Sequence, residues 1–315
     1  MNYSSEAIDY MRQIEENGFV ILRDAVDKNL ISEVAQKVKR DQQNNKEMWH
    51  STDRNRDSSF MLHEELLSVL DLPVVAELSN LVCGFDHRVD HVLTIKSRIT
   101  AESVQDVKDL NLQTVHGGPF SNGGLNHYLP GFPLDKAVPR CGRLNLGVPL
   151  TPGNDSIGNC VFLKGSHVYK DYLCCVENGK GLGGAPLPYL EELEKSCPAV
   201  IPDVKPGDLF LFADALFHGT TKHLQDRITV YFMLTKGTAT LMDYNTMARP
   251  YFDVAKTENQ KFRFMPPWYF VRNTTVYAAG ESNFVYSEKF TPFPGSEQTI
   301  EENRWKFLKR FKEWI

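Results

Sequence analysis

The chain has 315 residues, of which 42% are hydrophobic, and a formal net charge of −5 at pH 7. This length suits one large domain or two small ones and is enough to bury a sizeable core. No long basic run is present, which argues against a nucleic-acid polymer as a partner. The first residues lack the basic and apolar regions of a signal peptide, and no apolar stretch approaches the ~18 residues that span a bilayer. We therefore expect a cytoplasmic protein that makes no contact with membranes.

The N-terminal quarter of the sequence predicts helices around the start of a sheet. Residues 18–22 (GFVIL) are typical of a short buried strand, and Asp27 is suited to cap a helix whose apolar residues fall on one face. The polar run at 41–57 predicts a loop. Further helices are predicted at 5–16, 63–70 and 74–83, followed by a strand near 89–99.

The central part of the sequence has strand and turn character, interrupted by long segments. Residues 119–139 contain too many turn formers for regular structure, and we expect this segment to act as a substrate lid. The six cysteines show no CxxC spacing, so we expect them to be buried and reduced. Six short sequence blocks stand out in this part of the chain. In chain order they are 116–118 (HGG), 142–150 (GRLNLGVPL), 159–163 (NCVFL) with 165–167 (GSH), 206–212 (PGDLFLF), 217–219 (FHG) and 226–237 (DRITVYFMLTKG).

The order of these blocks resembles the phytanoyl-CoA dioxygenase-like family of Fe(II)/2-oxoglutarate oxygenases. Members of that family carry a "PGSH"-like turn, a "PGD" turn into a strand, a distal "HG" and a later arginine, and the match covers residues 15–235. The resemblance implies a mainly β fold with flanking helices and a double-stranded β-helix (jelly-roll) core. We expect one domain over 1–315, with its core at about 85–240, bracing helices at 1–84 and an aromatic-rich extension at 241–315.

The same resemblance assigns roles to three residues. His116 and His218 would bind Fe(II), because a jelly roll brings an early and a late strand together at its open mouth. Arg227 would hold the distal carboxylate of 2-oxoglutarate, since a planar guanidinium suits bidentate carboxylate binding. An ordinary ion pair at a strand end is the alternative for this arginine. O2 would be the oxidant.

Gly118 departs from the family pattern, which has a carboxylate two residues after the first histidine. Its missing side chain leaves room and a charge deficit for a small anion beside the metal. Non-haem iron halogenases show His-x-Gly or His-x-Ala here, so this resemblance implies bound chloride and chlorination of an unactivated C–H bond in a small molecule. The alternatives are a hydroxylase that takes its carboxylate from Asp214, and a non-catalytic binding protein on the same fold. On a continuous strand Asp214 and His218 would lie ~13 Å apart, too far to share an ion, whereas an intervening turn would bring them closer.

The substrate and the partners are less constrained by the sequence. A zinc hydrolase would need a third protein ligand, and the chain has no His-Glu-x-x-His cluster. The last stretch, 299–315, predicts an amphipathic helix that docks on the barrel or on a second copy, in a monomer or a homodimer, with a membrane-surface helix as the alternative. A nucleotide-like substrate would use basic residues at the mouth, for which the candidates are Lys96, Arg98, Lys136, Arg140 and Arg143.

Overall fold

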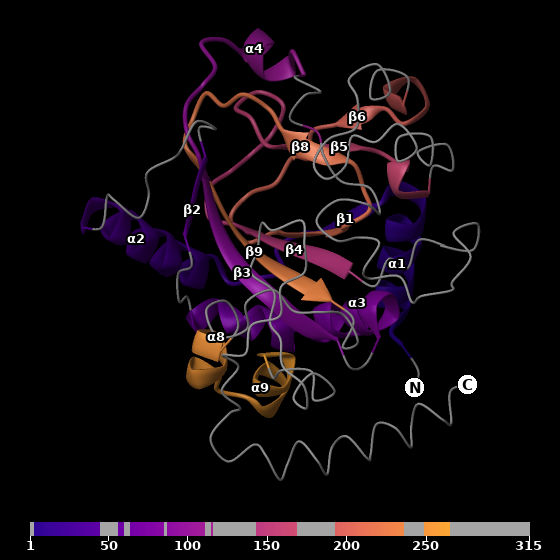
Figure 1. Cartoon of the computed structure of the whole chain (residues 1–315), viewed down its shortest axis with the longest axis vertical. Coiled ribbons are helices and arrows are strands. Elements are labelled where there is room, and N and C mark those ends of the chain that lie inside the picture. Colours follow the sequence, from indigo (N-terminus) through magenta and orange to yellow (C-terminus); the bar gives the residue numbers. More distant parts are fainter. Residues whose placement is uncertain are drawn as a thin grey trace, which may run out of the picture.

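The computed structural model of the chain describes residues 3–44, 56–59, 64–84, 87–110, 115, 143–168, 193–235 and 249–264. In these residues two antiparallel sheets face each other, with helices on the outer side of the larger one (Figure 1). The larger sheet has the strand order β1 (Phe19–Leu22), β7 (Leu209–Ala213), β4 (Arg143–Pro149), β9 (Arg227–Thr235), β3 (Arg88–Ser97) and β2 (Arg56–Ser59). The smaller sheet has the order β6 (Ala199–Val200), β5 (Cys160–Leu163) and β8 (His218–Thr220).

From β4 onward the chain winds back and forth between the two sheets. It leaves the larger sheet after β4 for β5 and β6, returns for β7, leaves again for β8 and returns for β9. This alternation between two facing sheets is the winding of a jelly roll. The predicted core architecture is therefore confirmed.

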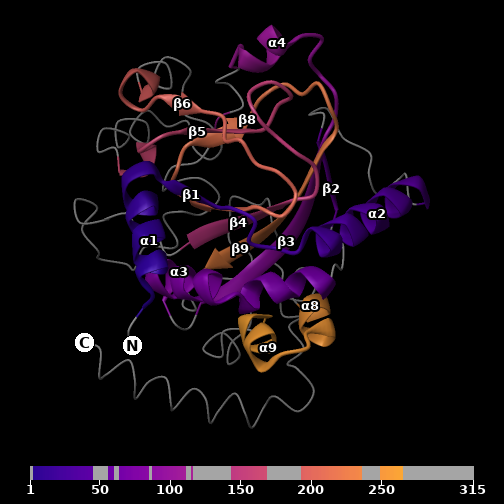
Figure 2. The same ribbon diagram turned by 180° about the vertical axis from the view of Figure 1, so that it is seen from behind.

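The helices lie mainly against the outer face of the larger sheet, and Figure 2 shows α1 and α2 from behind. Asp27 caps α2 as predicted, because its carboxylate accepts the backbone N–H of Asn29 at 2.8 Å. Ser4 caps α1 by accepting the N–H of Ala7. The helices are α1 (Ser5–Asn17), α2 (Lys28–Asn44), η2 (Glu64–Asp71), α3 (Pro73–Cys83), α4 (Val104–Lys108), η6 (Ser166–Val168), α8 (Arg249–Val254) and α9 (Glu258–Phe264).

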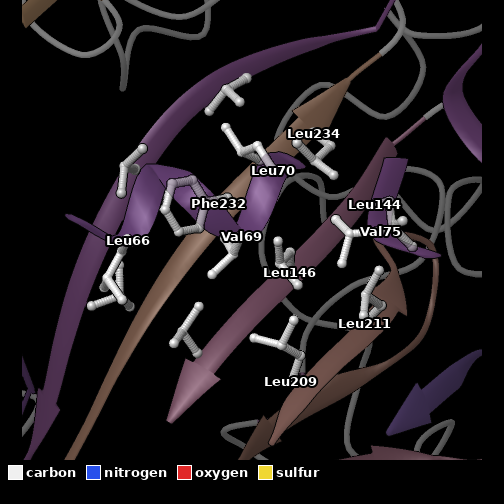
Figure 3. Packing of buried hydrophobic residues seen from close by; sticks show 14 of the residues in the cluster. Leu66, Val69, Leu70, Val75, Leu144, Leu146, Leu209, Leu211, Phe232 and Leu234 are labelled. Atoms are coloured by element: carbon white, nitrogen blue, oxygen red, sulfur yellow. The ribbon is translucent and has the colours of Figure 1, made fainter. Parts of the chain in front are cut away.

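Alternate residues of the central strands fill the main hydrophobic cluster (Figure 3). Side chains on a strand point to opposite faces in turn, so every second residue meets the helices. On this outer face, leucine and phenylalanine side chains from three strands pack against η2 and α3, and burial of each contributes about 1.5–3 kcal/mol. The labelled members are Leu66, Val69, Leu70, Val75, Leu144, Leu146, Leu209, Leu211, Phe232 and Leu234.

Several predicted boundaries were wrong. The predicted loop at 41–57 begins too early, because α2 continues to Asn44, and it ends too late, because β2 begins at Arg56 and pairs with β3. The sequence of β2, RDSS, has no apolar alternation that would have predicted a strand. Two short helices, α8 and α9, were also missed in the C-terminal extension. The segments 119–139 and 299–315 lie outside the described residues.

Two further observations concern the helices and the cysteines. In the ranges given above, no single helix is long and apolar enough to cross a membrane. The helices η2 and α3 together have the length and composition for a span, but the pair is bent by 72°. Cys83, Cys160 and Cys197 are buried, as predicted for them. The other three cysteines lie outside the described residues.

Candidate functional site

The candidate site occupies the inner face of the larger sheet, which is turned toward the smaller sheet. Along β9, residues that face the helices alternate with residues that face the smaller sheet. One of the latter, Tyr231, belongs to an inner aromatic cluster with Phe162, Phe210 and Phe212. Gly147 of β4 lies directly opposite Phe210, whose ring occupies the space that a side chain would need. The sheet therefore presents a mostly apolar inner surface, with polar groups at its ends.

His218 begins β8 and faces this inner surface. It pairs in register with Phe162, and its ring meets the ring of Phe212 edge to face at a centroid distance of 4.8 Å. Its Nδ1 lies 2.7 Å from the carbonyl oxygen of Leu216. A carbonyl oxygen only accepts, so Nδ1 is the donor and the neutral ring carries its lone pair on Nε2. This is the orientation that metal ligation by Nε2 requires.

The residues that precede the two predicted metal ligands belong to one hydrophobic cluster. Val115 is buried with Phe217, and Val161 and Leu163 of β5 complete the contact. His116 and Gly118 themselves lie outside the described residues, so their place in the site remains a prediction. Within the described ranges there is no group of three or more His, Cys, Asp and Glu side chains that could hold a metal ion.

Arg227 begins β9 and is buried on the inner face at 4% exposure. One terminal nitrogen donates to Asn159 Oδ1 at 2.9 Å and to Cys160 Sγ at 3.1 Å, and the other donates to the Tyr231 hydroxyl at 3.2 Å. Its Nε is buried without a hydrogen-bond partner. Among the residues that the structure describes, no carboxylate pairs with this guanidinium, so the predicted alternative of a strand-end ion pair is not what is found there.

The surroundings keep Arg227 charged. Burial by itself lowers the pKa of the guanidinium, but the neighbouring Cys160 and Tyr231 more than offset it, and the pKa is raised above its usual value. An unbalanced buried charge is costly unless an anion compensates it. None of its three described hydrogen-bond partners is a carboxylate, so the arginine fits a ligand that brings one.

His223 was not singled out by sequence analysis, because a lone histidine in a loop carries no signal. It is buried, its Nε2 lies 3.2 Å from Thr220 Oγ1, and its Nδ1 has no hydrogen-bond partner. Burial and then the positive charge of Arg227 lower the pKa of His223 to about 3. The imidazole is therefore neutral beside the guanidinium and adds no second positive charge.

Asp214 lies in a turn and not on a continuous strand. β7 ends at Ala213, and β8 begins at His218 in the other sheet. The Asp214 carboxylate accepts from Asn145 Nδ2 at 3.2 Å and lies 3.8 Å from Arg143. The turn that the hydroxylase alternative requires is present, but this carboxylate is engaged by β4.

The basic residues proposed for a nucleotide-like substrate do not form one group in the described part of the chain. Lys96 forms an ion pair with Asp226 at 3.1 Å, at the start of β9. Arg143 lies opposite Thr235, at the other end of that strand. Arg143 is buried on the inner face. Lys136 and Arg140 lie outside the described residues.

Comparison with known proteins identifies similar structures but no similar sequence. No family model matches the chain, and no curated protein matches it significantly. EctD from S. alaskensis with 2-oxoglutarate and 5-hydroxyectoine aligns with a TM-score of 0.54 at 13% identity, over 76% of this chain and 80% of that one. The epimerase SnoN in complex with Fe3+, alpha ketoglutarate and nogalamycin RO aligns with a TM-score of 0.54 at 15% identity, over 75% and 86%.

The chain has the double-stranded β-helix fold of these proteins. At such low identity the similarity establishes the architecture, and it bears on residue roles only through the geometry described above.

Proposed function

We propose that the chain is an Fe(II)/2-oxoglutarate-dependent oxidative enzyme. The observation that carries the proposal is Arg227, a buried and charged guanidinium whose described hydrogen-bond partners include no carboxylate. It lies on the inner face that also receives His218. Solved structures of the same fold hold 2-oxoglutarate, in EctD, and Fe3+ with alpha ketoglutarate, in SnoN, and they support this assignment.

His218 and His116 would hold Fe(II), and Arg227 would hold the distal carboxylate of 2-oxoglutarate. When bound there, Fe(II) and 2-oxoglutarate would supply the chemistry that activates O2. The hydrogen bond from Nδ1 to the Leu216 carbonyl fixes the imidazole of His218 in the orientation that ligation by Nε2 requires. Val115 and Phe217, the residues just before His116 and His218, belong to one hydrophobic cluster, and this supports a shared site.

Within this class we propose halogenation of a C–H bond as the reaction. Its basis is Gly118, which leaves the metal without the usual carboxylate and with space for chloride. Hydroxylation is the second candidate, and the turn after β7 is the observation that favours it, because it separates Asp214 and His218 by a chain reversal. We place Asp214 second because Arg143 and Asn145 already engage it.

An anaerobic titration tests these assignments without knowledge of the substrate. Chelation of 2-oxoglutarate by Fe(II) gives a visible absorption band, which should appear in the wild type and be lost in His218→Ala. Chloride and then bromide should shift this band in the wild type and leave it unshifted in Gly118→Asp, because the new carboxylate excludes the anion.

Three outcomes separate the candidates. Absence of the band in the wild type refutes the enzyme class and favours a non-catalytic binding protein. A band that ignores both halides refutes the halogenase, and its loss in Asp214→Asn then supports the hydroxylase. A halide-sensitive band that persists in Gly118→Asp refutes the role of Gly118.

A further inference from the structure

One end of the inner face carries polar side chains that the proposed chemistry does not use. Asn145 of β4 and Thr235 at the end of β9 are 1% and 0% exposed. Asn145 Oδ1 and Thr235 Oγ1 have no hydrogen-bond partner. A buried polar atom left unsatisfied costs about 1–3 kcal/mol, so two of them on one surface require an explanation.

The two unsatisfied atoms belong to neighbouring residues on the same face. Arg143 lies directly opposite Thr235, and Asn145 lies directly opposite Met233, which makes Asn145 and Thr235 diagonal neighbours on adjacent strands. Diagonal neighbours have side chains roughly 7 Å apart, which is the span of one small group hydrogen-bonded to both. We call Arg143, Asn145, Asp214 and Thr235 the inner polar cluster.

The hydrogen bonds within the cluster fix the orientation of Asn145. Its Nδ2 donates to the Asp214 carboxylate, which can only accept, so the amide cannot be turned over without placing two acceptors together. Oδ1 is therefore the atom that is presented to a ligand. A group that binds there must donate a hydrogen bond, which excludes a carboxylate.

The charge of the cluster favours a neutral ligand group. Arg143 and Asp214 are oppositely charged and 3.8 Å apart, so together they carry no net charge. An ammonium would approach Arg143, and an anion would approach Asp214, both in a buried setting where like charges are costly. A hydroxyl group donates to Asn145 and accepts from Thr235, and it satisfies both atoms without adding charge.

Beside the cluster the inner face is apolar and incompletely covered. Met233 is opposite Asn145 and only partly buried, as are Leu93 and Ile95 of the neighbouring β3. Phe212, the other residue opposite Asn145, is the ring that contacts His218. The cluster thus lies one cross-strand pair away from the side chain that we assign to the metal.

We propose that the inner polar cluster binds a neutral hydroxyl group of an otherwise apolar organic substrate. The apolar body would lie on Met233, Leu93 and Ile95, with a C–H bond directed toward His218. The proposal rests on the proposed function, which it deepens by naming a substrate class. It disfavours the nucleotide-like substrate, because a phosphate would face Asp214 and the acceptor atom of Asn145.

Three probes that share a ring and differ in one group test the proposal on the full chain without iron. They are cyclohexanol, cyclohexylamine and cyclohexanecarboxylic acid, whose affinities can be measured by ligand-observed NMR and calorimetry. Cyclohexanol should bind at least about fivefold more tightly than the other two, the ratio that one hydrogen bond contributes. Asn145→Leu and Thr235→Val should each weaken the binding of cyclohexanol by about the same factor.

Thr94→Val is the matched control. Thr94 also has a buried Oγ1 without a partner, but it lies opposite Val230 and so on the outer face of the same sheet. It should leave the affinity for cyclohexanol unchanged. Thr235→Val keeps the shape of the side chain, so it carries the test if Asn145→Leu does not fold.

Equal binding of the three probes, or no binding, would overturn the proposal. An unchanged affinity in both cluster variants would also do so, and would mean that the two atoms are satisfied by internal water only. Because these measurements need neither iron nor 2-oxoglutarate, their failure leaves the halide titration intact. Failure of that titration in turn leaves the probe affinities as an independent result.

Discussion

Replacing Arg227 by leucine removes the group that we expect to bind 2-oxoglutarate. Of the five hydrogens on a guanidinium, three are donated to Asn159, Cys160 and Tyr231. The remaining two are on Nε and on the nitrogen that faces Tyr231, and N–H groups on two nitrogens of one guanidinium can bind one carboxylate together. Hydrogen bonds to charged groups contribute about 1.5–3 kcal/mol each, so the pair contributes about 3–6 kcal/mol.

This magnitude sets the expected result. Arg227→Leu should weaken 2-oxoglutarate binding by at least about a hundredfold, since every 1.4 kcal/mol is tenfold. Arg227→Lys keeps the charge but loses the forked pair of donors, so its affinity for 2-oxoglutarate should lie between those of the wild type and Arg227→Leu. Binding of Fe(II) should change little, because the arginine meets the carboxylate that is remote from the metal.

Calorimetry of 2-oxoglutarate binding in the presence of Fe(II) and without oxygen provides the measurement. Arg12→Leu is a suitable control, because Arg12 is exposed on α1 and forms an ion pair with Asp9 one turn earlier in that helix. It should bind 2-oxoglutarate like the wild type. A folded Arg227→Leu protein that binds 2-oxoglutarate with unchanged affinity would refute the assignment.

Three further predictions concern stability and are measurable by denaturant unfolding. Asp208 is fully buried and accepts hydrogen bonds from Arg23 and from two backbone amides, so Asp208→Ala should lower the free energy of unfolding by about 3 kcal/mol. Gly147→Ala should lower it by about 1–3 kcal/mol, because the new methyl group would collide with the ring of Phe210; an unchanged midpoint would contradict this packing. The folded His223 imidazole resists protonation down to about pH 3, whereas the unfolded one takes up a proton near pH 6.5, so acid favours unfolding. Stability should therefore fall between about pH 6 and 4 by roughly 2–3 kcal/mol more in the wild type than in His223→Gln, and parallel pH profiles would refute this.

The sequence predicted the core strands because they are buried on both faces. Blocks such as 142–150 and 226–237 are apolar runs between turn formers, and these correspond to β4 and β9. The strand β2 was missed because its four residues carry no apolar pattern and are held by pairing with β3. Pairing to an existing strand depends on backbone groups, which a pattern of side chains does not reveal.

The candidate site was predictable only where a motif marked it. Arg227 and His218 belong to sequence blocks, and both lie on the inner face. Asn145 and Thr235 lie inside strands whose composition shows only that they are buried. Their lack of hydrogen-bond partners depends on which side chains surround them in space, and so it becomes visible only in the structure.

The two-residue period of β9 explains how one strand serves both the core and the site. Ile228, Val230, Phe232 and Leu234 face the helices, and the residues between them, beginning with Arg227, face the smaller sheet. A shift of one residue in the register would bury the arginine against η2 and α3 and expose the leucines to the inner face. The hydrophobic cluster on the outer face therefore fixes the register that holds Arg227 at one end of the inner face and Thr235 at the other. Stability of the core and position of the proposed binding groups are, in this strand, consequences of the same alternation.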